Sequence, residues 1–154
     1  MLSMVFAPVI DTSMPDTLLI DDVDVWKLAD DIAECYGLDG ALVRAVMKIE
    51  SNGDIYARHK LSGCLGLMQI FPKWHGNQPD SIYFQPETNL DLGCGYLVWL
   101  FEMFPEDTMR VLTAYNYGQN HKQTRVIGTS DYAKKVMKVY KLYGQNSSID
   151  RCSE

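Results

Sequence analysis

The stretch Val46–Asn52, VMKIESN, ends an apolar run with the carboxyl group of Glu50, and two residues with capping side chains follow it. Val43, Val46 and Glu50 recur at spacings of three and four, which predicts one helix face with Glu50 on its apolar side. Burial and the helix dipole both disfavour an ionised carboxylate there. We therefore expect the pKa of Glu50 to lie above its ordinary value of about 4.3, so that the group can serve as a general acid.

Hydrophobic periodicity predicts a mainly α protein, with about five helices joined by loops and at most a small sheet. The first helix is expected to start at a cap on Asp21 or Asp22 and to stop at Gly37, and Asp39 is expected to cap the second. The later helices are predicted to start at Pro86, Asp107 and Ser130. Residues 52–66 read as a loop or short hairpin and 119–128 as a polar loop.

The length of 154 residues and the 47% hydrophobic content suit one domain with one core. A formal net charge of −6 argues against a nucleic-acid-binding surface, which would be basic. No apolar run approaches the ~18 residues of a membrane span, and the start MLSMVFAPVI lacks the basic residues of a secretory signal. We expect an extended arm over 1–20, one domain over 21–144 and a flexible tail over 145–154.

The histidines and cysteines do not have the spacing of a metal site. His59, His75 and His121 fall in different predicted loops, and there is no CxxC pair. We expect neither a metal nor a cofactor. The cysteines are Cys35, Cys64, Cys94 and Cys152. They are expected to be mostly reduced, with Cys64 and Cys94 the pair to check for a disulfide.

Two further segments place polar side chains within apolar frames. GLMQI, residues 66–70, carries the amide of Gln69, which donates and accepts hydrogen bonds and suits an N-acetyl or hydroxyl group of a sugar. AYNYG, residues 114–118, places Tyr115 and Asn116 at a helix end, where side chains can reach a cleft. Trp74 and Trp99 could stack on sugars, but aromatic residues at helical spacing mostly belong to the core, and the core is the expected place for both.

The chain closely resembles the catalytic domain of soluble lytic transglycosylases in a series of motifs. In chain order these motifs are ES, GLMQI with the following proline, NL, G, YL and AYNYG. These enzymes of glycoside hydrolase family 23 share a lysozyme-like α+β fold with goose-type lysozyme. The resemblance covers about Asp21 to Gly144. The motifs of the middle part fall on Asn89, Leu90, Gly93, Tyr96 and Leu97.

The resemblance implies that Glu50 is the catalytic acid and that Tyr115 lies close to it. The substrate contacts that it implies are Ser51, Ser62, Met68, Gln69, Tyr115, Asn116 and Tyr132. Either His59 or Ser62 takes the position of the family's serine, because the stretch before GLMQ is one residue longer here. Gly128 and Ser130 stand where the family carries acidic and basic residues.

The implied activity is that of a peptidoglycan lytic transglycosylase. Glu50 would protonate the oxygen between N-acetylmuramic acid and N-acetylglucosamine, and would then take the proton of the muramic acid C6 hydroxyl as a 1,6-anhydro ring closes. Two alternatives stand beside it. One is a goose-type muramidase with a second carboxylate such as Asp54, and the other is a non-catalytic wall-binding or virion structural module.

The expected partner is the peptidoglycan glycan strand, with no nucleic acid and no membrane span, and the expected state is a monomer. The wall lies outside the cytoplasm, yet no signal peptide is visible. These two points together predict a phage protein, carried in the virion or released at lysis, or a part of a wall-spanning secretion assembly. A host enzyme without its signal sequence is the alternative.

Overall fold

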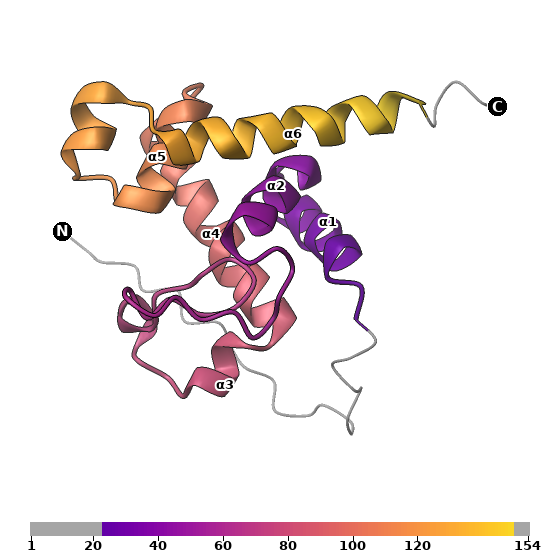
Figure 1. The fold of residues 1–154 in the computed structure, drawn as a ribbon, viewed down its shortest axis with the longest axis vertical. Helices are drawn as coiled ribbons and strands as arrows, with labels where there is room; N and C mark the ends of the chain where they lie inside the picture. Colours follow the sequence, from indigo (N-terminus) through magenta and orange to yellow (C-terminus); the bar gives the residue numbers. More distant parts are fainter. Residues whose placement is uncertain (1–22, 150–154) are drawn as a thin grey trace.

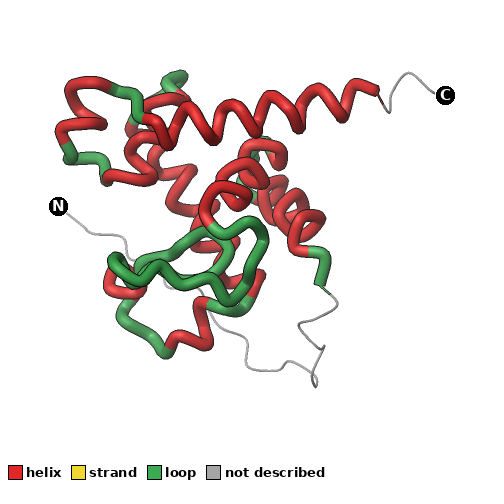
Figure 2. The backbone as a smooth tube through the Cα atoms, in the orientation of Figure 1, coloured by secondary structure: helices red, strands yellow, loops and turns green. Residues whose placement is uncertain are grey.

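The computed structural model describes residues 23–149, which form helices joined by loops (Figures 1 and 2). The long helices are α1 (Val25–Cys35), α2 (Gly40–Glu50), α4 (Pro86–Met103), α5 (Thr108–Tyr117) and α6 (Asp131–Ile149). The short ones are η2 (Pro72–His75), α3 (Asp80–Tyr83) and η3 (Gln123–Ile127). Over 23–149 there is no strand, only isolated bridges that join Leu65 to Arg58 and to Ile70. The mainly helical prediction is confirmed.

The predicted starts are correct for all the long helices except the first, and α4 begins at Pro86 without a side-chain cap. Asp39 and Asp107 cap α2 and α5 with their carboxylates. Helix α1, however, is capped by Asp24, whose side chain accepts hydrogen bonds from the amides of Trp26 and Lys27 at 3.0 and 3.1 Å. The predicted caps at residues 21 and 22 lie outside the described residues. Asp24 takes the role because its extended backbone immediately precedes the first helical residue.

Two predicted segments differ from the structure. The polar loop expected over 119–128 contains η3, a short π-helical turn in which the amide of Gly128 donates to the backbone carbonyl of Gln123 at 2.9 Å. Gly128, with φ +69°, ends this turn. Helix α6 runs to Ile149, past the expected domain end at 144. The expected arm over 1–20 lies outside the described residues.

Helix α4 runs through the middle of the fold, with α1 and α2 on one side and the loop region 51–85 below it in the view of Figure 1. Helix α2 packs between α1 and α6, and α5 packs against α4 and α6. The core residues of α2 are Leu42, Val43, Ala45, Val46 and Met47. Because α2 is enclosed in this way, its last residue is held at a fixed place beside α6.

The long loop between α2 and α4 has no sheet to order it and is fastened instead by Asn89. This side chain is 1% exposed. Its Oδ1 accepts from the amide of Met68 at 2.7 Å, and its Nδ2 donates to the carbonyls of Leu65 and Tyr83 at 2.9 and 2.7 Å. Gly66 is required beside it, because at φ +76° a Cβ would lie 2.4 Å from the Tyr83 carbonyl.

Candidate active site

Glu50, the last residue of α2, lies against the start of α6. The hydroxyl of Tyr132 donates a hydrogen bond of 2.6 Å to its Oε1. Burial raises the pKa of Glu50 from 4.5 to about 7, and the bond from Tyr132 opposes that rise because it favours the ionised form. The raised pKa expected for Glu50 is confirmed. At neutral pH the carboxyl group can therefore both give and take a proton.

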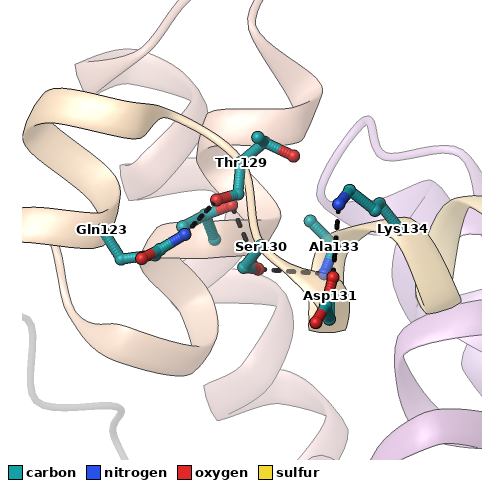
Figure 3. Close-up of polar contacts among 7 residues, drawn as sticks. Gln123, Thr129, Ser130, Asp131, Ala133 and Lys134 are labelled. Atoms are coloured by element: carbon teal, nitrogen blue, oxygen red, sulfur yellow. Dashed lines mark hydrogen bonds and ion pairs between the residues drawn. The ribbon is translucent and has the colours of Figure 1, made fainter.

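The start of α6, which carries Tyr132, is fixed by side chains (Figure 3). The Oγ of Ser130 accepts a hydrogen bond from the amide of Ala133 at 3.1 Å, as the predicted cap requires. The side-chain Nε2 of Gln123 donates to the backbone carbonyl of Thr129 at 2.6 Å and connects the preceding turn to this cap. The phenol of Tyr132 is therefore held at a defined position beside the carboxyl group.

Replacing Tyr132 by phenylalanine should raise the pKa of Glu50 further, because the hydrogen bond that favours the carboxylate is lost. A pH titration of the Glu50 carboxyl carbon by NMR should then show its midpoint above the wild-type value of about 7. Tyr140→Phe is the control, since that phenol bonds Asp39 at 2.7 Å, away from Glu50. A midpoint that is equal or lower in Tyr132→Phe would contradict the assigned effect of this bond.

An open cleft of about 620 Å³ lies between the loop region 61–80 and the facing parts of α4 and α5. Its lining includes four of the expected contacts: Ser62, Gln69, Tyr115 and Asn116. Burial is the main reason that the pKa of Cys64 and that of Tyr115, which both line the cleft, are raised, and the nearby charge of Glu50 raises both further. Glu50 therefore lies beside the cleft and close to Tyr115, as the resemblance implied.

The expectation that Met68 lines the cleft is wrong. Its side chain is fully buried and packs on Gly93, where an added Cβ would lie 2.8 Å from it. Its backbone carbonyl accepts the hydroxyl of Tyr115 at 2.9 Å. Met68 therefore holds Tyr115 in place from behind, through its backbone rather than its side chain.

Gln69 has a backbone conformation that is rare for a residue with a side chain, φ +52°. Its Nε2 donates to the carbonyls of Gly66 and Ala57 at 2.9 and 3.3 Å. Among residues 23–144 no donor contacts its Oε1, which leaves that oxygen as an acceptor in the cleft lining. Strained backbone of this kind costs about 1–3 kcal/mol and clusters at functional sites.

The remaining expected contacts have local roles. Ser51 is the C-cap residue that follows α2, and its Oγ accepts a hydrogen bond from the backbone amide of Gly53 at 3.1 Å. The Oγ of Ser62 accepts a hydrogen bond from the backbone amide of Cys64 at 3.3 Å, and the backbone amide of Ser62 donates to the Nδ1 of His59 at 3.2 Å. Of the two candidates for the family's serine, Ser62 lines the cleft and His59 is outside the set of lining residues.

Aromatic rings form much of the cleft, and the interpretation of Trp74 and Trp99 as core residues is wrong, because both are exposed. Phe71 and Trp74 lie edge to face at 5.6 Å, Trp74 and Tyr96 at 5.9 Å, and Tyr96 and Tyr115 are tilted at 5.4 Å between centroids. Trp74 is 63% and Trp99 41% exposed. The signal for Trp74 was its place in the polar stretch KWHGNQPD, outside any helical stripe.

The other carboxylates offer no obvious partner for Glu50. Asp54 is exposed and accepts from the amide of Tyr56 at 2.9 Å. Asp80 lines the cleft but is paired with Arg58 at 2.7 Å. In the described part of the chain no cluster of three or more His, Cys, Asp or Glu side chains could hold a metal ion.

The cysteines of the described region are free thiols, and they are Cys35, Cys64 and Cys94. Cys64 and Cys94 are therefore not joined by a disulfide, and Cys152 lies outside the described residues. Nor is any helix within 23–149 both long enough and apolar enough to pass through a bilayer.

The fold matches that of a solved lytic transglycosylase. It is similar to an X-ray structure of an inactive mutant of lytic transglycosylase Slt from Pseudomonas aeruginosa, with a TM-score of 0.67 and 21% identity over 79% of this chain and 24% of that one. The model of the transglycosylase SLT domain matches residues 27–138, and the chain belongs to this family.

Similar sequences carry the same kind of name. Membrane-bound lytic murein transglycosylase C of Photorhabdus laumondii is 39% identical over 101 residues, which cover 54% of this chain and 28% of that protein. Membrane-bound lytic murein transglycosylase E of Buchnera aphidicola is 30% identical over 103 residues, which cover 56% of this chain and 46% of that protein. The match thus spans less than half the length of either relative.

Proposed function

We propose that this protein is a peptidoglycan lytic transglycosylase in which Glu50 moves the proton. The observation that carries the proposal is a carboxyl group with a pKa of about 7, bonded by Tyr132 and lying beside a cleft lined with aromatic rings and amides. Aromatic faces and amide groups are suited to sugars, whose rings present both C–H and hydroxyl groups. The wall glycan is the substrate class that family membership favours.

In the proposed reaction the protonated Glu50 gives its proton to the oxygen between N-acetylmuramic acid and N-acetylglucosamine, and the C1–O bond breaks. The carboxylate that remains takes the proton of the muramic acid C6 hydroxyl, whose oxygen bonds to C1. Glu50 thus regains its proton, no water is consumed, and a 1,6-anhydro end forms. Tyr132 steadies the carboxylate between the two steps.

The alternative is a muramidase, in which a second carboxylate activates water or attacks the sugar. Glycosidases of that kind hold two carboxyl groups about 5–9.5 Å apart. Asp54, the candidate expected for that role, is exposed and accepts a hydrogen bond from the backbone amide of Tyr56, and Asp80 forms an ion pair with Arg58 at 2.7 Å. These contacts favour the single-acid reaction over hydrolysis.

The product of digestion tests the proposal directly. Purified sacculi treated with the protein should release muropeptides that end in 1,6-anhydromuramic acid, each lighter by one water than the hydrolysed product. Mass spectrometry separates the two, with a muramidase digest of the same sacculi as the control. Release of hydrated ends alone would replace the proposal with the muramidase, and release of nothing would favour a non-catalytic wall-binding module.

We further propose that the protein acts on the wall as a monomer, through a domain that covers at least the family match. The virion, lysis and secretion-assembly settings remain proposals that rest on the sequence. Detection of the chain in purified virus particles, with particle-free lysate as the control, tests the first of them. Sedimentation of the pure protein tests the monomer.

A further inference from the structure

Beyond the cleft, the row of rings continues to a residue that does not line it. The ring of Trp99, one turn after Tyr96 on α4, is stacked on the Tyr96 ring with a centroid distance of 5.8 Å and an angle of 19° between planes. Trp99 is 41% exposed. The ring of Trp74, which is 63% exposed, also contacts the Tyr96 ring, edge to face at a centroid distance of 5.9 Å. Two exposed indoles thus contact one half-buried phenol.

This arrangement is unusual for rings that serve packing alone. A large aromatic side chain on a helix normally turns its face toward the core, and exposed apolar groups that adjoin a cleft mark binding surfaces. In residues 23–144 neither indole nitrogen donates a hydrogen bond to the protein. Trp74 and Trp99 therefore offer both open ring area and a free N–H donor to a ligand.

The occupant that fits is a sugar. The apolar C–H face of a pyranose can lie on an indole, while its hydroxyl or N-acetyl oxygen accepts the N–H. The amide of Asn77 and the ammonium group of Lys73, both in the cleft lining near Trp74, can reach further hydroxyl groups. A peptide or lipid partner would call for a wider apolar or charged area than these rings supply.

We propose that Trp74, Tyr96 and Trp99 form a second carbohydrate platform, which holds an N-acetylhexosamine of the glycan strand outside the reacting part of the cleft. Its place follows from the ring contacts. Tyr115, which lies close to Glu50, touches Tyr96, and Tyr96 in turn touches Trp99. The platform thus holds the strand at a distance from the bond that is cut. This proposal rests on the proposed function, since it assigns a further contact to the same glycan.

The platform is tested by binding of chitohexaose, a β-1,4-linked hexamer of N-acetylglucosamine, measured by calorimetry. Trp99→Ala should weaken binding about tenfold, as the loss of one stacked aromatic contact predicts. Trp99→Phe should keep most of the affinity, because the ring is retained. Tyr56→Ala is the matched control, an aromatic residue that is 55% exposed, packs on one other ring and lies outside the cleft lining.

Activity provides the second readout. On sacculi, Trp99→Ala should raise KM with little change in kcat, since the residue does not touch the reacting bond. Wild-type affinity of Trp99→Ala for the hexamer, or an equal loss in Tyr56→Ala, would overturn the platform. Because chitohexaose binding does not depend on the reaction, failure of the platform and absence of anhydro products can be told apart.

Discussion

Glu50→Gln should reduce the release of anhydromuropeptides from sacculi about 10²–10⁴-fold, the range that general acid–base catalysis supplies. Glutamine keeps the shape of the side chain and can still accept the hydroxyl of Tyr132, but it can neither give nor take the proton. Glu34→Gln, which removes an exposed carboxylate on α1, is the control and should leave release unchanged. Release is quantified by mass spectrometry of the soluble products.

The same substitution should make the folded state more stable at pH 8. The pKa of Glu50 is raised from 4.5 to about 7 in the folded state, so folding favours the protonated form. Its contribution to stability is fully present below pH 4.5, falls as pH rises through about 7, and becomes a cost above that. Removing the ionisable group should relieve up to about 3 kcal/mol of that cost, measured by urea unfolding.

Stability and activity together make this test decisive. If the Glu50→Gln variant is inactive but unfolds at a higher urea concentration than wild type at pH 8, the variant has lost its proton-transferring group and has kept its fold. The difference between the two proteins should shrink at pH 5, where Glu50 is protonated in the folded wild type. Retained release of anhydromuropeptides would refute Glu50 as the proton carrier.

Asn89→Ala should destabilise the fold by about 3–5 kcal/mol, because buried polar groups left without a partner cost about 1–3 kcal/mol each. The amide of Met68 and the carbonyl of Tyr83 would both be orphaned. For a domain of this size the thermal midpoint should fall by about 10 °C. The loop between α2 and α4 should loosen first, with faster amide hydrogen exchange at Met68.

Asn120→Ala is the control for this prediction, since that side chain is exposed in the turn after α5. It should change stability by less than about 0.5 kcal/mol. A small loss for Asn89→Ala, similar to that of the control, would mean that water can replace the three hydrogen bonds. Such a result would contradict the conclusion that the hydrogen bonds of Asn89 hold the loop between α2 and α4 in place.

Much of the helical framework was readable from the sequence. The caps at Asp39, Asp107 and Ser130 were predicted correctly because capping depends on a few neighbouring residues. The cap of α1 was missed by two residues, since several aspartates stand close together there and only the backbone conformation selects Asp24. The turn η3 was missed because the hydrogen bond from the amide of Gly128 to the carbonyl of Gln123 has no signal in the polar sequence around it.

For the candidate site, the types of residue could be predicted from the sequence, but the directions in which their side chains point could not. Gln69 and Met68 are neighbours in GLMQI, yet the first lines the cleft and the second is buried against α4. That division follows from the positive φ at Gly66 and Gln69, which turns the chain between them. The exposure of Trp99 likewise depends on what packs beside α4, which periodicity within one helix cannot report.

By itself, the sequence determined that an acid would stand on the apolar face at the end of a helix, because spacing along a helix is a local property. Only the tertiary structure decided what that acid would meet. Tyr132, 82 residues further along, reaches Oε1 of Glu50 because α6 packs on α2. The raised pKa comes from burial by residues that are distant in the chain, and desolvation is fixed by the folded surroundings and not by neighbours in sequence.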